Sequence, residues 1–153
     1  MPRAPIGMDV SLREITKETL RDVLRLSVAP EQERYVANNS VSIAQAHFHK
    51  DAWFRAIYAG DTPVGFVMLS DIPEKAEYFL WRFMIDRNHQ RKGYGKRALE
   101  LLVEHVRTRP GATHLYTSYK VGDGSPEEFY KRFGFVPTGD VDADGEHLAR
   151  IEL

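Results

Sequence analysis

The sequence predicts a single α/β (α+β) domain over residues 1–153, in which helices flank a mixed, mostly antiparallel sheet. Two observations support this fold class. The spacing of apolar residues changes along the chain between the helical and the extended period, which gives the element order β α α β β β α β α β β. Residues 93–109 form the clearest helix, because their apolar side chains make one stripe and Pro110 and Gly111 follow it.

The N-terminal part is expected to form one strand and two helices. Residues 10–15 alternate between apolar and polar side chains, which is the pattern of a strand. Thr16 can cap a following helix, which Pro30 ends. Ser42 has a glutamine three positions later, the spacing of a capping box, so we expect a second helix over residues 43–50.

The remaining strands are predicted over residues 53–59, 64–69, 77–85, 113–119, 135–141 and 147–153. Two hairpins are predicted from turn residues. One joins the first two of these strands, and the other joins the last two at Asp144–Gly145. A short helix over residues 126–133 is also expected, since a proline stands in its first turn and Gly134 can end it.

Composition restricts the class of protein without identifying its function. The chain has 153 residues, of which 42% are apolar and 28% charged, with a net charge of −1 and no cysteine. This charge gives no reason to expect nucleic acid or an anionic membrane as a partner, and the lack of cysteine excludes disulfides and a cysteine nucleophile. No apolar run approaches the length of a membrane span, and residues 1–8 contain no hydrophobic segment of a secretory signal, so we expect a cytoplasmic protein.

The most informative segment lies between the strand at residues 77–85 and the clearest helix. It contains Gln90, Arg91, Lys92, Gly93, Tyr94, Gly95 and Lys96. The first amide hydrogens of a helix have no intrahelical acceptor and lie at the positive end of the helix dipole, and glycine lets a ligand approach the backbone closely. The segment therefore predicts a phosphate or pyrophosphate site, the alternative being an ordinary strand-to-helix turn with solvated basic side chains. It matches neither a P-loop nor the three-glycine dinucleotide motif.

A second segment follows the strand predicted at residues 113–119 and contains Phe129, Tyr130, Lys131, Arg132, Phe133, Gly134 and Phe135. Its three phenylalanines are expected in the core. Tyr130 is either an amphipathic neighbour of that core or a proton donor.

These two segments, in this order, resemble the signature of the GNAT superfamily of acyl-CoA-dependent N-acyltransferases. The resemblance covers nearly the whole chain, because the element order also fits, and it implies a sheet whose strands splay apart to admit the cofactor. Residues 80–86 are similar to bacterial spermine/spermidine-type acetyltransferases. The resemblance therefore implies direct transfer of an acetyl group from acetyl-CoA to a primary amine of a small molecule, with a polyamine as the leading substrate.

The same resemblance implies which residues bind the cofactor and act as the acid. Tyr130 matches the tyrosine that protonates the leaving CoA thiolate. Asp123 stands where the family often has an asparagine, and its ionised carboxylate cannot donate a hydrogen bond as that asparagine would. The implied cofactor-binding residues are Phe83, Met84, Ile85, Gln90, Arg91, Lys92, Gly93, Tyr94, Gly95, Lys96, Asp123, Phe129 and Arg132.

An aliphatic ammonium has a pKa of about 10.4, so a base must remove its proton before it attacks a thioester. Our preferred base is Glu77, at the start of the strand at residues 77–85, with Glu74 and Asp71 as alternatives in the preceding loop. Each of these three residues could equally be an ordinary solvated carboxylate.

Acidic and aromatic residues at the expected entrance of the cleft would attract a cationic substrate. These substrate candidates are Glu31, Glu33, Tyr35, Glu74 and Trp81.

Several alternatives remain open from the sequence. The amine could belong to an amino acid, an antibiotic or a protein N-terminus, or the domain could bind acetyl-CoA as a sensor without turnover. A homodimer is expected by analogy with relatives. The segment from Asp140 to Asp144 resembles the start of a calcium-binding loop. Such a loop needs a glutamate at the position that Ile151 occupies, so no metal is expected.

Overall fold

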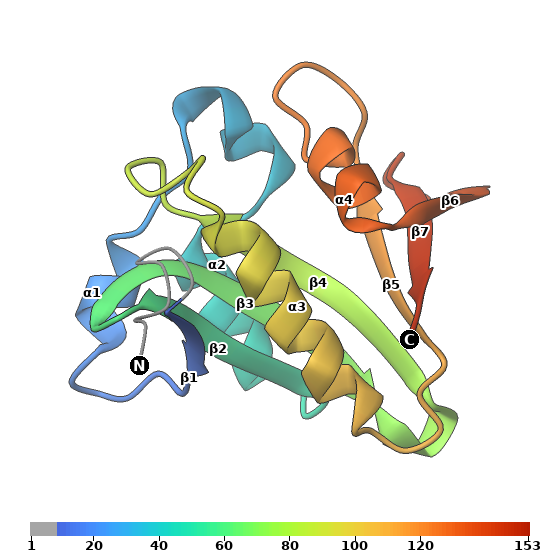
Figure 1. Ribbon diagram of the computed structural model, residues 1–153, viewed down its shortest axis with the longest axis horizontal. Coiled ribbons are helices and arrows are strands. Elements are labelled where there is room, and N and C mark those ends of the chain that lie inside the picture. The colour runs from blue at the N-terminus through green and yellow to red at the C-terminus, as the bar shows by residue number, and fades with distance from the viewer. Residues whose placement is uncertain (1–8) are drawn as a thin grey trace, which may run out of the picture.

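Seven strands form one sheet in the order β1-β2-β3-β4-β5-β7-β6 in a computed structural model that describes residues 9–153 (Figure 1). The strands are β1 (Val10–Arg13), β2 (Ala52–Ala59), β3 (Thr62–Ile72), β4 (Glu77–Ile85), β5 (His114–Tyr119), β6 (Val136–Val141) and β7 (His147–Glu152). Neighbouring strands are antiparallel except β4 and β5, which are parallel, so the predicted fold class is confirmed. The expectation that no secretory signal is present concerns residues 1–8, which lie outside the described residues.

Helices cover both faces of this sheet (Figure 1). They are α1 (Leu20–Leu24), α2 (Asn39–His47), α3 (Tyr94–Arg107) and α4 (Glu127–Phe133), with the short 3-10 helices η2 (Pro30–Tyr35) and η3 (Pro73–Lys75). Because side chains alternate along a strand, Val67 and Leu69 of β3 pack in the core under α3, whereas Phe66 and Met68 pack with Val23 of α1 on the opposite face. Within residues 9–153, no helix is both long and apolar enough to cross a membrane.

The start of α2 differs from the sequence prediction. α2 begins at Asn39, and the side-chain oxygen of Asn38 accepts a hydrogen bond from the Val41 amide at 3.0 Å. Ser42, the predicted capping residue, instead lies inside the helix and is buried. The predicted start at residue 43 is wrong because asparagine caps a helix as well as serine does, and the earlier of the two caps is used.

The sheet splays at the carboxyl ends of β4 and β5. These strands pair only where Phe79 lies beside Tyr116 and Leu80 beside Thr117. The next residue, Trp81, is an extra residue in β4 relative to β3, and such a β-bulge bends a strand and increases its twist. β4 then continues along β3 while β5 continues along β7, so the two halves of the sheet diverge (Figure 1).

Candidate active site

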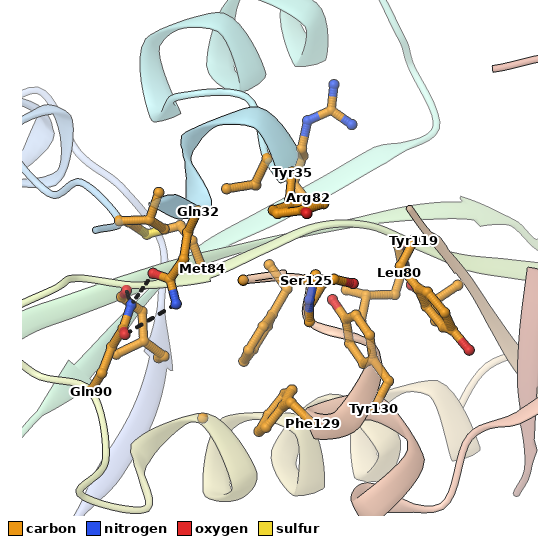
Figure 2. Close-up of a pocket in the computed structure, with 18 of the residues that line it drawn as sticks. Gln32, Tyr35, Leu80, Arg82, Met84, Gln90, Tyr119, Ser125, Phe129 and Tyr130 are labelled. Carbon is orange, nitrogen blue, oxygen red and sulfur yellow. Dashed lines mark hydrogen bonds between the residues drawn. The ribbon is translucent and has the colours of Figure 1, made fainter. Parts of the chain in front are cut away.

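The divergence of β4 and β5 opens a cavity of about 910 Å³ (Figure 2). Residues of β4, the turn before α3, the end of β5, α4, η2 and the β6–β7 turn line it. Cavities that bind small molecules have volumes of roughly 300–1,000 Å³, and open sheets with parallel strands bind ligands at the carboxyl ends of those strands. The cavity is therefore the candidate active site of this fold.

Most of the residues singled out in the sequence meet in this cavity. Tyr130 lines it, as do Glu33, Tyr35 and Trp81 among the substrate candidates. The cofactor candidates that line it are Phe83, Met84, Ile85, Gln90, Arg91, Gly93, Tyr94, Gly95, Lys96, Phe129 and Arg132.

The other candidates lie elsewhere. Lys92 and Glu74 are exposed and do not line the cavity. Glu31 and Asp123 border a second, more open pocket between η2 and the loop before α4. The expected contact of these four side chains with a ligand in the main cavity is therefore not supported by their positions.

The geometry of β4 places Glu77 away from the cavity. Glu77 is the first residue of the strand and pairs with Ile72, whereas residues 80–85 of the strand line the cavity. At about 3.3 Å per residue, roughly 10 Å of extended backbone separates Glu77 from Leu80, where the lining begins. Asp71 is held at the same distant end by an ion pair with Arg109 at 3.0 Å. None of these carboxylates lines the cavity, so their positions do not support the expectation that they lie beside the cleft, because β4 reaches the cavity only from Leu80 onwards.

The turn before α3 presents open backbone to the cavity. Gly93 is the N-cap of α3 with a φ of 84°, and beyond its chain neighbours no atom of residues 9–153 lies within 4 Å of the position that a side chain would occupy. The first amide hydrogens of this 14-residue helix have no intrahelical acceptor. Arg91 and Lys96 line the cavity beside them. The turn thus combines the free amides, the helix dipole and the cations that favour a bound phosphate.

Backbone strain at Arg91 predicts a stabilising substitution. Arg91 has a φ of 62°, in the left-handed region, which costs a residue other than glycine about 1–2 kcal/mol. Glycine removes this strain but gains more freedom in the unfolded chain, about 0.4–1 kcal/mol. We expect Arg91→Gly to raise the free energy of unfolding by about 0.5–1 kcal/mol in urea denaturation. A lower stability of the variant would show that contacts of the Arg91 side chain outweigh the strain.

Tyr130 lies on α4 with its ring in the core and its hydroxyl directed into the cavity (Figure 2). The ring stacks on Tyr119 at 5.9 Å between centroids and meets Phe135 edge-on at 5.5 Å. Burial raises the pKa of Tyr130 above its ordinary value, a hydrogen bond with Thr117 opposes the rise, and the charge of Glu146 adds to it. A tyrosine in this environment keeps its proton at neutral pH, so Tyr130 can donate a proton but cannot serve as the base.

Side-chain hydrogen bonds connect η2 to the walls of the cavity on two sides. Gln90 donates a hydrogen bond to Gln32 of η2 at 2.8 Å and another to the Ile85 carbonyl at 2.9 Å (Figure 2). The Tyr35 hydroxyl donates to the Asp123 carbonyl at 2.6 Å. η2 therefore spans the opening between the β4 half and the α4 half of the domain, and Asp123 contributes its main chain to this bridge.

Glu146 is a cavity residue that the sequence analysis missed. It directly precedes His147, which pairs with Tyr119 at the end of β5, so the register places Glu146 at the point where the sheet splays. Burial raises the pKa of Glu146, and the nearby carboxylate of Asp142 adds to the rise. The local sequence gives no signal for this role, since the segment is typical of a hairpin turn and only the pairing of β7 with β5 brings it to the cavity.

Comparison with known proteins identifies the family. Residues 12–135 match the family model described as the acetyltransferase (GNAT) family. The chain belongs to this family. This GNAT protein is 30% identical over 155 residues to the spermine/spermidine N(1)-acetyltransferase of Bacillus subtilis (strain 168), an alignment that covers 95% of this chain and 100% of that relative. The resemblance inferred from the two sequence segments is thus confirmed.

Solved structures share the GNAT fold of this chain. An acetyltransferase from Thermus thermophilus has a TM-score of 0.74 at 19% identity, covering 96% of this chain and 99% of that one. The PaiA N-acetyltransferase of Thermoplasma acidophilum, solved in complex with coenzyme A, has a TM-score of 0.69 at 18% identity, covering 95% and 100%. At these identities the similarity shows the fold alone.

The chain is therefore a GNAT acetyltransferase, and the GNAT fold uses acetyl-CoA as the acetyl donor. The residues present fit such a molecule. The space in front of Gly93 is open to a phosphate, and in the described part of the chain no strand pairs with residues 83–85 on the side of β4 that faces the splay. The cavity joins these two features, so a long, flexible cofactor arm can follow the edge of β4 inwards from the phosphate site.

Proposed function

We propose that this acetyltransferase moves an acetyl group from acetyl-CoA to a primary amine of a polyamine, in the cavity between β4 and β5. The observation that carries the proposal is the lining of one cavity by the open turn at Gly93, the hydroxyl of Tyr130 and several carboxylates. The 30% identity to a relative named for spermine and spermidine supports the choice of amine.

The cofactor half of the reaction is assigned to β4, α3 and α4. The main-chain amides of residues 91–96 bind the pyrophosphate, with Arg91, Lys96 and Arg132 as cations. The free edge of residues 83–85 pairs with the pantetheine arm as an added strand would. The Ile85 carbonyl has two lone pairs, so it can accept from the arm while it accepts from Gln90.

The bound thioester supplies an activated acyl carbon, and residues of this chain donate and accept the protons of the reaction. Tyr130 is assigned to protonate the sulfur that leaves, since burial keeps its hydroxyl protonated at neutral pH. A main-chain amide of β4 is assigned to stabilise the negative charge that develops on the carbonyl oxygen. The sequence has no cysteine, so direct transfer to the amine is favoured over an acyl-enzyme.

The amine half is assigned to η2 and the β6–β7 turn. Among residues 9–153, the carboxylates that line the cavity are those of Glu33, Asp144 and Glu146. The aromatic rings of Tyr35 and Trp81 line it as well, and such rings attract cations. A polyamine carries several ammonium groups and so can satisfy more than one of these sites, which a monoamine cannot.

Arg82 favours a second candidate class of substrate. It lines the cavity, and its Nη2 donates to the Gln45 side chain at 3.0 Å. Its Nε atom is buried and has no hydrogen-bond partner among the residues that the structure describes. A substrate with a carboxylate next to its amine, such as an amino acid or a protein terminus, could pair with the part of the Arg82 guanidinium that lines the cavity.

Release of the CoA thiol, followed with each of several amines, tests the proposal. We expect spermidine and spermine to raise thiol release well above the rate without amine, and mass spectrometry to show the acetylated polyamine. A preference for amino acids over both polyamines would support the substrate class suggested by Arg82. Flat release with every amine, despite acetyl-CoA binding in calorimetry, would instead support the sensor alternative.

Two further expectations from the sequence stay predictions. Light scattering coupled to size-exclusion chromatography tests the homodimer, and fractionation of the producing cells tests the cytoplasmic location.

A further inference from the structure

We propose that Glu146 is the general base that takes the proton from the substrate ammonium, opposite Tyr130 as the acid. This inference rests on the proposed function, because it names the base of that same reaction. It replaces the candidates Glu77, Glu74 and Asp71, none of which lines the cavity.

The backbone of the β6–β7 turn holds Glu146 in place. The side-chain Oδ1 of Asp142 accepts hydrogen bonds from the amides of Asp144 and Glu146, each at 2.9 Å. The Asp142 amide donates to the Glu146 carbonyl, also at 2.9 Å. The main chain of Glu146 is thus fixed on both sides, and its carboxylate is left to line the cavity at the end of β5.

The other basic groups in the cavity suit the role less well. Glu33 and Asp144 are exposed, whereas Glu146 is partly buried where the sheet splays. His89 lies in the turn between β4 and α3, beside the proposed phosphate site. Glu146 is the partly buried carboxylate of the cavity, and it lies close enough to Tyr130 for its charge to act on that hydroxyl.

The charged groups around Glu146 come from several elements. Burial raises the pKa of Glu146 above its ordinary value, and Asp142 and Asp144 of its own turn add to the rise. Lys120 at the end of β5 and Arg82 of β4 lower it. Tyr130 of α4 faces the same cavity as a neutral group. A carboxylate with a raised pKa is a stronger proton acceptor than an ordinary glutamate.

The proton transfers balance over one turnover. Glu146 takes one proton from the ammonium, and the resulting amine nitrogen bonds to the acyl carbon as the carbon–sulfur bond breaks. Tyr130 gives its proton to the departing sulfur. A second proton of the same nitrogen then passes to the Tyr130 oxygen, directly or through water, and Glu146 releases its proton to solvent. The products are the amide, the free thiol and one proton.

The pH dependence of kcat/KM in Glu146→Gln tests the proposal. Glutamine keeps the size of the side chain and the main-chain contacts of the turn but cannot accept the proton. We expect kcat/KM for the amine to fall by about 10²–10⁴-fold and the acidic limb of the wild-type profile to disappear, while the Kd of acetyl-CoA in calorimetry changes by less than about twofold. Asp140→Asn is the matched control, because Asp140 is an exposed carboxylate of the same hairpin that does not line the cavity.

A titration of the protein labelled with ¹³C at the glutamate carboxyl carbons gives a readout that does not depend on turnover. The resonance that disappears in Glu146→Gln should titrate above the other glutamates and should shift when spermidine is added. An ordinary pKa without a response to the amine, or a variant that keeps the wild-type acidic limb, would overturn the role of Glu146. A wild-type protein that acetylates no amine would refute the proposed function instead, and the titration would still decide whether Glu146 meets the amine.

Discussion

Tyr130→Phe is expected to lower kcat by about 10²–10⁴-fold while the Kd of acetyl-CoA changes by less than about twofold. Phenylalanine keeps the ring that stacks on Tyr119 and meets Phe135, so the core around α4 is preserved. It removes only the hydroxyl that points into the cavity (Figure 2). The sulfur must then leave as an unprotonated anion in a partly dehydrated site, which raises the barrier. Steady-state kinetics and calorimetry separate the two quantities.

Tyr119→Phe is a matched control for this variant. The Tyr119 hydroxyl points away from the cavity in Figure 2 and is buried without a hydrogen-bond partner in the described part of the chain. Because the Tyr119 hydroxyl makes no hydrogen bond with the described residues, its removal leaves no other group without a partner. We therefore expect no loss of stability and a kcat near that of the wild type. If Tyr130→Phe had full activity and the wild-type pH profile, Tyr130 would not be the acid.

Gly93→Val is expected to weaken acetyl-CoA binding by about 10–100-fold, because losing one or two charge-assisted hydrogen bonds costs roughly 1.5–3 kcal/mol. The added side chain would occupy the open space in front of the α3 amides, where the proposed phosphate lies. It also forces a branched residue to adopt a φ of 84°, which costs about 1–2 kcal/mol of stability. Calorimetry with acetyl-CoA measures the first effect and urea denaturation the second.

Gly139→Val separates the two effects. Gly139 lies in β6 with a φ of 93° and does not line the cavity. As at Gly93, no atom in the described part of the chain, chain neighbours apart, lies within 4 Å of the position of a side chain. We expect a similar loss of stability from this variant and an unaltered Kd. Equal affinity of the Gly93 and Gly139 variants for acetyl-CoA would mean that the turn before α3 does not bind the phosphates.

The parts of the site that lie within one continuous segment can be predicted from the sequence. Residues 90–96 and Tyr130 are recognisable because their chemistry depends on a local feature, either a helix start or one side chain of a short helix. The predicted base, Glu77, does not line the cavity, because which carboxylates reach the cavity depends on pairing between distant strands. Glu77 is near the cofactor segment in the sequence yet lies at the far end of β4, whereas Glu146 is distant in the sequence yet lies in the cavity.

Periodicity, turn chemistry and short motifs are local properties, and they were enough to specify the element order, the last hairpin, the glycine turn and the family. Only the tertiary structure decides where the sheet opens. The bulge at Trp81 and the two-residue pairing of β4 with β5 arise from contacts between strands, which the local sequence does not specify. The same holds for the meeting of Glu146 and Tyr130 in one cavity. Local propensity cannot specify that Glu146 and Tyr130 lie in one cavity. Their proximity depends on the register between β5 and β7, which is set by the packing of whole strands on a shared core.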